Sequence, residues 1–333
     1  MKFKLTLDAK SSKHTIDYGD KLMLIGSCFT ENIGAKFKTL LFNISENPYG
    51  ILFNPVSVAS ALTEIIEAKK YKVDELFQYN ELWHSWHHHS RFSAVDQDAA
   101  LDKINSSILT AHHFLKSANR LLITLGSAWL YHLTSDAPLG AGQVVANNHK
   151  APANWFFKSL MQPTVLIENL HGLVERLQVF NPNLHITFTI SPVRHLREGL
   201  IENNRSKAVL IHAVHELVGL CNQVDYFPAY EYVIDDLRDY RFYAEDLVHP
   251  NFAASGYVWE KLVETYMLSE TQSIMKQVAE IQLAMNHKPF FIGSVEHQKF
   301  LQSSIRKTEA LLEAHPGLPL QDHLAFFKTS ISK

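Results

Sequence analysis

The sequence has few cysteines and no long apolar run. Among its 333 residues are two cysteines, Cys28 and Cys221, which are too few for a disulfide framework and stand in no spacing typical of a metal site. No run of about 18 apolar residues occurs, so we expect no membrane span. The N-terminal stretch MKFKLTLDAKSSKHTIDYGD lacks the apolar core of a signal peptide, which predicts a cytoplasmic protein.

An excess of charge of one sign is also missing. The formal net charge is −3, which gives no reason to expect nucleic acid or an anionic membrane surface as a partner. Hydrophobic residues make up 46% and charged residues 20%, as is ordinary for a globular protein with a core. The length fits one large α/β domain, or one such domain with an appendage.

Short apolar segments alternate with helical patterns along most of the chain. We expect buried strands at 22–26, 120–126 and 184–190, with a weaker strand at 224–230. Apolar residues at three- and four-residue spacing predict helices at 32–42, 55–70, 98–119, 164–180 and 206–222. This alternation predicts a mainly parallel sheet with helices on both faces, whose active site lies beyond the carboxyl ends of the strands.

Beyond about residue 260 the chain has amphipathic helical patterns with no strands between them. We therefore expect a domain at 1–265 and a C-terminal helical appendage at 266–333. The appendage either packs on the domain or serves in homo-oligomerisation.

The stretch KLMLIGSCFTENIGAKF, residues 21–37, places two candidate nucleophiles, Ser27 and Cys28, where a strand turns into a helix. One interpretation is structural, because small residues are common at such turns and a serine there is often only a helix N-cap. The other is catalytic, because Gly126-Ser127 and Ser191-Pro192 also fall at the carboxyl ends of predicted strands. Only the catalytic interpretation predicts that a side chain of this turn contacts a substrate.

Asp246 and His249 stand three residues apart, just before Pro250. In a tight turn this spacing lets the carboxylate reach Nδ1 of the imidazole and leaves Nε2 free to take a proton from a hydroxyl. The alternative is an acidic helix N-terminus with a capping role.

These motifs, together with NPYGILFNP, VVANNHK, SPVRHLREGL and RDYRFYAEDLVHP, occur in an order that resembles the GSCFA family within the SGNH/GDSL hydrolase superfamily. The resemblance covers roughly residues 20–265. It implies a three-layer α/β/α sandwich and ester chemistry by a Ser-His-Asp arrangement, with no cofactor and no metal. Ser27 is then the nucleophile, His249 the general base and Asp246 its orienting carboxylate, while Cys28 packs.

Acyl transfer also needs hydrogen-bond donors for the developing oxyanion. The amide of Ser27 is one candidate, since it lies close to a helix N-terminus. The resemblance implies a glycine amide as well, for which Gly50 is the candidate unless Pro-Tyr-Gly is an ordinary turn. It further implies an asparagine after the third strand, where this sequence has Gly-Ser-Ala-Trp instead. The substitutes, in no order, are Ser127, Asn54 and Asn147.

The segment ELWHSWHHHSRFS, residues 81–93, carries four histidines among aromatic residues. Three interpretations are open: a metal shared by His87 and His89, a substrate-facing aromatic loop that includes His89, or a packed insertion with surface histidines. No carboxylate or cysteine stands at ligand spacing, so no metal is expected. Arg194, after the third strong strand, either holds an anionic or carbonyl group of the substrate or braces its loop.

The sequence thus predicts a serine-dependent hydrolase of a small-molecule or carbohydrate-linked ester. One alternative is an acyltransferase, in which an alcohol takes the acyl group in place of water. Another is a catalytically quiet scaffold that binds a carbohydrate or a partner.

Overall fold

The computed structural model describes residues 5–331, and the chain divides into two compact units. The first unit is formed mainly by residues 21–34 and 44–259. The second combines residues 9–20 and 35–43 with the C-terminal stretch from residue 260. The sequence placed a boundary at 265 and gave no sign that two N-terminal segments belong to the C-terminal unit.

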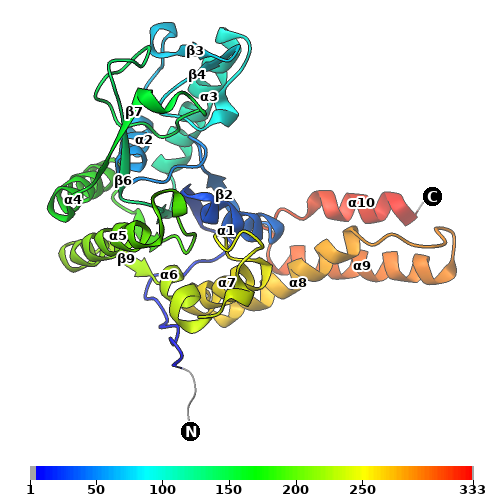
Figure 1. The fold of residues 1–333 in the computed structure, drawn as a ribbon. Coiled ribbons are helices and arrows are strands. Elements are labelled where there is room, and N and C mark those ends of the chain that lie inside the picture. Colours follow the sequence, from blue (N-terminus) through cyan, green and yellow to red (C-terminus); the bar gives the residue numbers. More distant parts are fainter. Residues whose placement is uncertain (1–4, 332–333) are drawn as a thin grey trace. The chain divides into compact units, whose positions relative to one another are not determined.

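The first unit is built around a five-stranded sheet with the order β2-β1-β5-β8-β9. Figure 1 labels the two edge strands of this sheet, β2 and β9. The strands are β1 Lys21–Gly26, β2 Asn43–Glu46, β5 Arg120–Leu125, β8 His185–Ile190 and β9 Val224–Phe227. β1 pairs with β5, β5 with β8 and β8 with β9, all in parallel. β9 ends at the residue before Pro228, which lacks the amide that would continue the ladder.

The described chain has seven α-helices before residue 269. They are α1 Cys28–Thr39, α2 Pro55–Ile66, α3 Gln97–Lys116, α4 Pro163–Phe180, α5 Leu200–Leu220, α6 Ala229–Glu231 and α7 Phe252–Tyr266. α2 begins at Pro55 because Asn54 caps it, accepting the Ser57 amide at 2.8 Å. Leu200 starts α5 well before the predicted residue 206, so the helix reaches back to the loop after β8.

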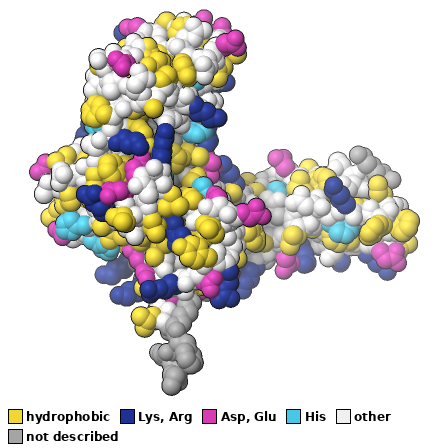
Figure 2. Space-filling model, viewed as in Figure 1, with side chains coloured by type: hydrophobic (Ala, Val, Ile, Leu, Met, Phe, Trp, Pro, Cys, Tyr) yellow, Lys and Arg dark blue, Asp and Glu magenta, His cyan; other side chains and the backbone are white. Residues whose placement is uncertain are grey.

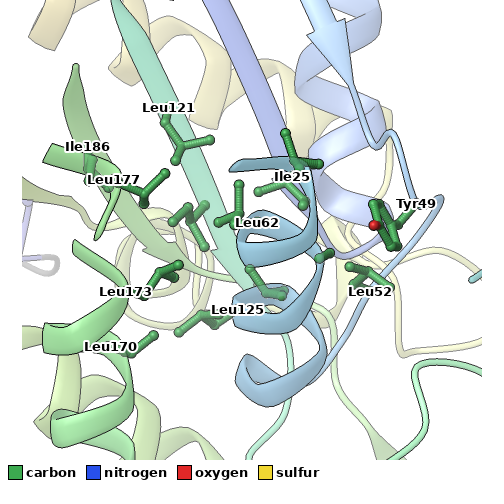
Figure 3. Close-up of a cluster of buried hydrophobic side chains, with 14 of the residues drawn as sticks. Ile25, Tyr49, Leu52, Leu62, Leu121, Leu125, Leu170, Leu173, Leu177 and Ile186 are labelled. Atoms are coloured by element: carbon green, nitrogen blue, oxygen red, sulfur yellow. The ribbon is translucent and has the colours of Figure 1, made fainter. Parts of the chain in front are cut away.

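Apolar side chains cover both faces of the sheet. Figure 3 shows Leu62 of α2 and three leucines of α4 packed against Leu121 and Leu125 of β5; the α4 residues are Leu170, Leu173 and Leu177. Residues that alternate with these along the strands, such as Leu22, Leu24 and Leu122, are buried as well. The predicted α/β/α sandwich with a mainly parallel sheet is confirmed.

Two small hairpins extend the first unit and were not predicted. One pairs β3 Phe77–Tyr79 with β4 Leu82–His84, and the other pairs β6 Trp129–Leu133 with β7 Phe156–Leu160. A satellite core of Phe77, Trp86, Leu133 and Val145 lies between them. β6 follows the carboxyl end of β5 directly, so the second hairpin rises beside the predicted site.

The second unit contains the predicted C-terminal helices, α8 Ser269–Met285, α9 Val295–Ala314 and α10 Gln321–Ile331. Its core joins apolar residues of these helices, such as Val278, Leu311 and Phe327, with Tyr18 from the N-terminal segment. Homo-oligomerisation through these helices stays a prediction. Within residues 5–331, no helix is both long and apolar enough to cross a lipid bilayer. Basic and acidic side chains are interspersed on the face shown in Figure 2.

Candidate active site

The turn between β1 and α1 is held tightly in place. Gly26 has φ +141°, and a Cβ there would lie 2.1 Å from the carbonyl oxygen of Thr124, so only glycine fits. The Gly26 amide donates to Oδ1 of Asn47 at 2.9 Å. α1 begins at Cys28, which leaves Ser27 as the residue just before the helix.

Ser27 has the contacts of a helix N-cap. Its side chain is fully buried at 0% exposure, and its Oγ accepts the amide of Phe29 at 3.3 Å. Its own amide donates to the Thr124 carbonyl at 3.2 Å, so that amide is not free to serve as an oxyanion donor, contrary to the prediction. Over residues 5–331, no hydrogen bond joins Ser27 Oγ to His249. The nucleophilic role of Ser27 stays a prediction.

Cys28 is the first residue of α1 and is half-buried. Its amide finds no acceptor in the described part of the chain, as is usual for the first amides of a helix. Burial raises the pKa of the Cys28 thiol, and the nearby carboxylate of Glu31 acts in the same direction. The amides of Cys28 and Phe29 and the ammonium group of Lys207 oppose this rise.

Lys207 lies beneath the carboxyl edge of the sheet. It comes from α5, is buried, and donates from Nζ to the carbonyls of Gly126 at 2.7 Å and Ser191 at 2.6 Å. Burial lowers the pKa of Lys207 to about 7. The sequence did not lead us to this residue. A signal was present, because Lys207 stands three residues before Leu210 on the apolar face of the helix. Lysine is rarely buried unless its ammonium group has a partner.

The predicted contact between Asp246 and His249 is present. Oδ2 of Asp246 lies 2.7 Å from Nδ1 of His249, and Oδ1 accepts the amides of Val248 and His249 at 2.9 and 3.0 Å. The hydrogen bonds from the His249 amide, the His249 ring and the Val248 amide lower the pKa of Asp246 to about 2. The His249 side chain is 48% exposed, and Nε2 has no hydrogen bond within residues 5–331.

Arg194 braces the turn that carries this pair. Its amide donates to the carbonyl of Val248 at 3.2 Å and its Nη1 to that of Leu247 at 3.3 Å. Its guanidinium group also stacks over Tyr243, 4.2 Å from the ring centroid. Of the two roles expected for Arg194, the structure shows the bracing one.

His195 connects the pair to the edge of the sheet. Its ring packs edge-on against Phe53, with centroids 5.4 Å apart, and its Nε2 is buried without a partner in the described residues. Burial, together with the nearby charges of Lys207 and His249, lowers the pKa of His195 to about 4, while the carboxylate of Glu198 opposes this fall. His195 is therefore neutral near pH 7.

A cavity of about 340 Å³ opens beside the carboxyl end of β5. It is lined by four predicted site residues, Ser127, Asn54, Asn147 and Arg194, and by His195. This volume is in the range of small-molecule sites.

Two of the three proposed substitutes for the missing asparagine are fully engaged. Ser127 donates its amide to Phe53, and its Oγ lies 3.2 Å from Oγ of Ser206. Asn54 uses Oδ1 to cap α2 and Nδ2 to bind the carbonyl of Val145 at 3.2 Å. Asn147 accepts the amide of His149 at 2.8 Å, while its Nδ2 has no acceptor among residues 5–331.

The prediction that the Gly50 amide is an oxyanion donor is wrong. That amide donates to the carbonyl of Asn47 at 2.7 Å and closes an ordinary turn with Gly50 at φ +76°. His89 packs against the same glycine, and its Nδ1 accepts the amide of Arg91 at 3.2 Å. Neither Gly50 nor His89 lines the cavity.

The histidine-rich segment is a packed insertion, but its histidines are largely buried rather than on the surface. His88 stacks on Tyr49 with ring centroids 4.2 Å apart, and its Nδ1 lies 3.0 Å from Oγ of Ser85. His149 binds the Ser85 carbonyl through Nε2 at 2.8 Å, and burial lowers its pKa to about 4. Over residues 5–331, no three His, Cys, Asp or Glu side chains gather as metal ligands.

Comparison with known sequences gives a clear family match. The model of the GSCFA family matches residues 21–262, and that of "GSCFA domain protein, C-terminal domain" matches residues 278–333. No curated protein matches the sequence.

Several solved structures resemble the fold weakly. A family 3 carbohydrate esterase from Clostridium thermocellum is 11% identical, with a TM-score of 0.35. The alignment covers 78% of this chain and 98% of the esterase chain. A family 3 carbohydrate esterase from Talaromyces cellulolyticus is 8% identical, with coverages of 77% and 98% and a TM-score of 0.36. An acetyl xylan esterase from Butyrivibrio proteoclasticus is 11% identical, with coverages of 74% and 63% and a TM-score of 0.37. Likenesses this low do not establish an activity for the chain.

Proposed function

The chain belongs to the GSCFA family, and we propose that it hydrolyses esters at the turn between β1 and α1. The observation that carries this proposal is the pair of Asp246 and His249. The carboxylate holds Nδ1 at 2.7 Å, and Nε2 of this half-exposed side chain is unpaired in the described residues. A histidine oriented in this way is the base half of a Ser-His-Asp arrangement.

In the proposed reaction, Nε2 of His249 takes the proton of a nucleophile on the turn while that nucleophile attacks the ester carbonyl. The tetrahedral intermediate collapses as the C–O bond to the alcohol breaks, and His249 returns the proton to the departing alcohol. Water, activated by the same imidazole, then releases the acyl group as a carboxylic acid. Asp246 keeps the imidazole in the tautomer that accepts at Nε2 and stabilises the imidazolium that forms.

The resemblance to SGNH hydrolases predicts that Ser27 is the nucleophile. In the resting geometry its buried Oγ accepts the Phe29 amide, so the hydroxyl has to leave this contact before it meets a substrate. The N-terminus of α1 supplies positive charge for the oxyanion, and the amide of Cys28 has no acceptor there among residues 5–331.

We place the non-reacting part of the substrate in the cavity beside β5. Trp129 and Tyr131 of β6 contribute aromatic rings to it, and Asn147 contributes an amide donor, Nδ2, that has no acceptor in the described residues. Apolar rings with a few polar groups suit a small-molecule or carbohydrate-linked ester.

A chromogenic ester assay tests the proposal. Purified protein should hydrolyse p-nitrophenyl acetate, and His249→Gln should lower kcat/KM about 10³-fold, because general-base catalysis typically contributes 10²–10⁴-fold. His171→Gln is the matched control, since this histidine is 39% exposed on α4 and lies 3.8 Å from the carboxylate of Glu175. Equal rates for the two variants would contradict the proposal. New ester formed from an added alcohol would identify a transferase, and folded protein without turnover would favour the quiet scaffold.

A further inference from the structure

Ser27 and Cys28 are neighbours in sequence but differ in solvent exposure and in hydrogen bonding. The Ser27 side chain has 0% exposure, and both its amide and its Oγ are engaged with backbone groups. Cys28 keeps part of its surface exposed, and its amide has no acceptor within the described chain. The residue Cys28 therefore keeps some contact with solvent, whereas the Ser27 side chain has none.

The surroundings of Cys28 favour negative charge. The thiol sits at the N-terminus of the 12-residue α1, where free amides and the helix dipole stabilise an anion. Lys207 adds a buried cation close enough to stabilise the thiolate. Burial nevertheless raises the pKa of the Cys28 thiol, so the resting group is neutral and needs a base. The pair of Asp246 and His249 is the base that the same edge of the sheet provides.

A second observation at this turn points to a ligand oxygen. Asn47 is only 2% exposed, and its Oδ1 accepts the Gly26 amide, yet its Nδ2 has no partner in the described residues. Nε2 of His195, which lies beside Gly126, is buried and unpartnered as well. A buried donor without an acceptor is costly, and a bound oxygen would satisfy it.

We infer that the nucleophile is Sγ of Cys28 and not Oγ of Ser27. This inference rests on the proposed function. His249 removes the thiol proton as the sulfur attacks the ester carbonyl, and the C–O bond breaks to release the alcohol with that proton. The acyl group is then held as a thioester on Cys28. Water cleaves the C–S bond, giving the carboxylic acid and restoring the thiol. As donors for the oxyanion we assign the amide of Cys28 and Nδ2 of Asn47, neither of which has an acceptor in the described residues.

Trapping the acyl group tests the assignment. Protein mixed with p-nitrophenyl acetate and quenched in acid should gain the mass of one acetyl group. Trypsin should release Leu22–Lys36, which carries both candidate residues, and fragmentation should place the acetyl group on Cys28. Neutral hydroxylamine should remove it, because it cleaves thioesters readily and oxygen esters slowly.

Variants sharpen the test. Ser27→Gly keeps a favoured N-cap residue and should still be acetylated on Cys28, whereas Cys28→Ala should lose acetylation at least about 10²-fold. Cys221→Ser is the matched control and should behave as the unmodified chain. An acetyl group on Ser27 that resists neutral hydroxylamine and survives Cys28→Ala would overturn the inference and leave the proposed function standing.

Alkylation separates the remaining outcomes. Iodoacetamide should modify Cys28 faster than Cys221, and His249→Gln should slow the modification of Cys28 alone, because the histidine acts as its base. Selective alkylation without any ester turnover would support the activated thiol and contradict the proposed ester hydrolysis. Equal alkylation of the two cysteines that is unaffected by His249→Gln would overturn the inference.

Discussion

Histidines occupy two regions of the first unit in opposite states. His249 is 48% exposed, is bound to an ionised carboxylate through Nδ1, and has no hydrogen bond at Nε2 within the described part of the chain. His88 and His149 are 1% and 8% exposed and lie among aromatic rings of the insertion. In the insertion, burial lowers the pKa of both residues, so they are neutral packing groups near neutral pH. The partner and the exposure of an imidazole therefore indicate its role better than the number of histidines in a segment.

The largest effect is expected at the exposed pair of Asp246 and His249. It distinguishes a role of Asp246 in orienting the imidazole from a role in stabilising the fold. Asp246→Asn keeps an oxygen for the amides of Val248 and His249 but presents an NH₂ group to Nδ1, which favours the wrong tautomer. We expect kcat to fall about 10³-fold with Tm unchanged. Asp239→Asn, at another exposed turn, is the control and should keep full activity. A fall in Tm that accounts for the lost activity would make Asp246 a structural residue.

The next prediction concerns the stability of the protein at acidic pH, which depends on the buried His149. Because the pKa of His149 is lowered from 6.5 to about 4, the unfolded chain binds a proton there in this pH range that the folded chain does not. The free energy of unfolding should therefore decrease by about 3 kcal/mol as the pH falls from 6.5 to 4. Urea unfolding at several pH values should show a shallower decrease for His149→Asn, which tolerates the positive φ of this position. Identical slopes would contradict the buried neutral state.

A smaller effect is expected from the carboxylate beside this region. Glu64 accepts the hydroxyls of Tyr49 at 2.8 Å and Tyr71 at 2.9 Å and pairs with Lys69. Glu64→Gln should lower the free energy of unfolding by about 2 kcal/mol, because the tyrosine hydroxyls then donate to a neutral amide and the ion pair with Lys69 is lost. Glu67→Gln, at an exposed pair with Arg176, should cost less than about 1 kcal/mol. Chemical denaturation of both variants measures the difference, and equal losses would refute the special role of Glu64.

The smallest effect is expected for the stability of a variant at the exposed histidine, compared with a variant at a buried one. His249→Gln should change the free energy of unfolding by less than about 0.5 kcal/mol, since the ring is half-exposed and away from the core. His88→Gln should cost several times more, because it removes a buried ring stacked on Tyr49. Thermal unfolding of the two variants side by side checks this, and a larger loss for His249→Gln would reverse the assignment.

The sequence predicted the sheet well and the fine geometry of the site poorly. β5 and β8 are continuous apolar runs, and their burial on both faces is a direct consequence of that pattern. The two short hairpins were missed because their strands of three to five residues carry no sustained alternation. The spacing of Asp246 and His249 sufficed to predict their contact, since it depends on one local turn.

The roles of Ser27 and Cys28 depend on where α1 starts. The helical pattern was recognised from residue 32, whereas the helix begins at Cys28. A start at Cys28 makes Ser27 the cap and leaves the next residue with the free amide. Gly50 was misjudged for a similar reason, because the acceptor of its amide is set by a turn whose closure the sequence did not reveal.

Pre-steady-state kinetics tests the central claim most directly. If ester cleavage at the β1–α1 turn passes through an acyl-enzyme, rapid mixing with p-nitrophenyl acetate should give a burst of nitrophenolate close to one equivalent per chain, followed by slower turnover. The burst should disappear in His249→Gln and persist in His171→Gln. A linear time course from the first turnover, equal in all three proteins, would contradict an acyl-enzyme formed with His249 as base.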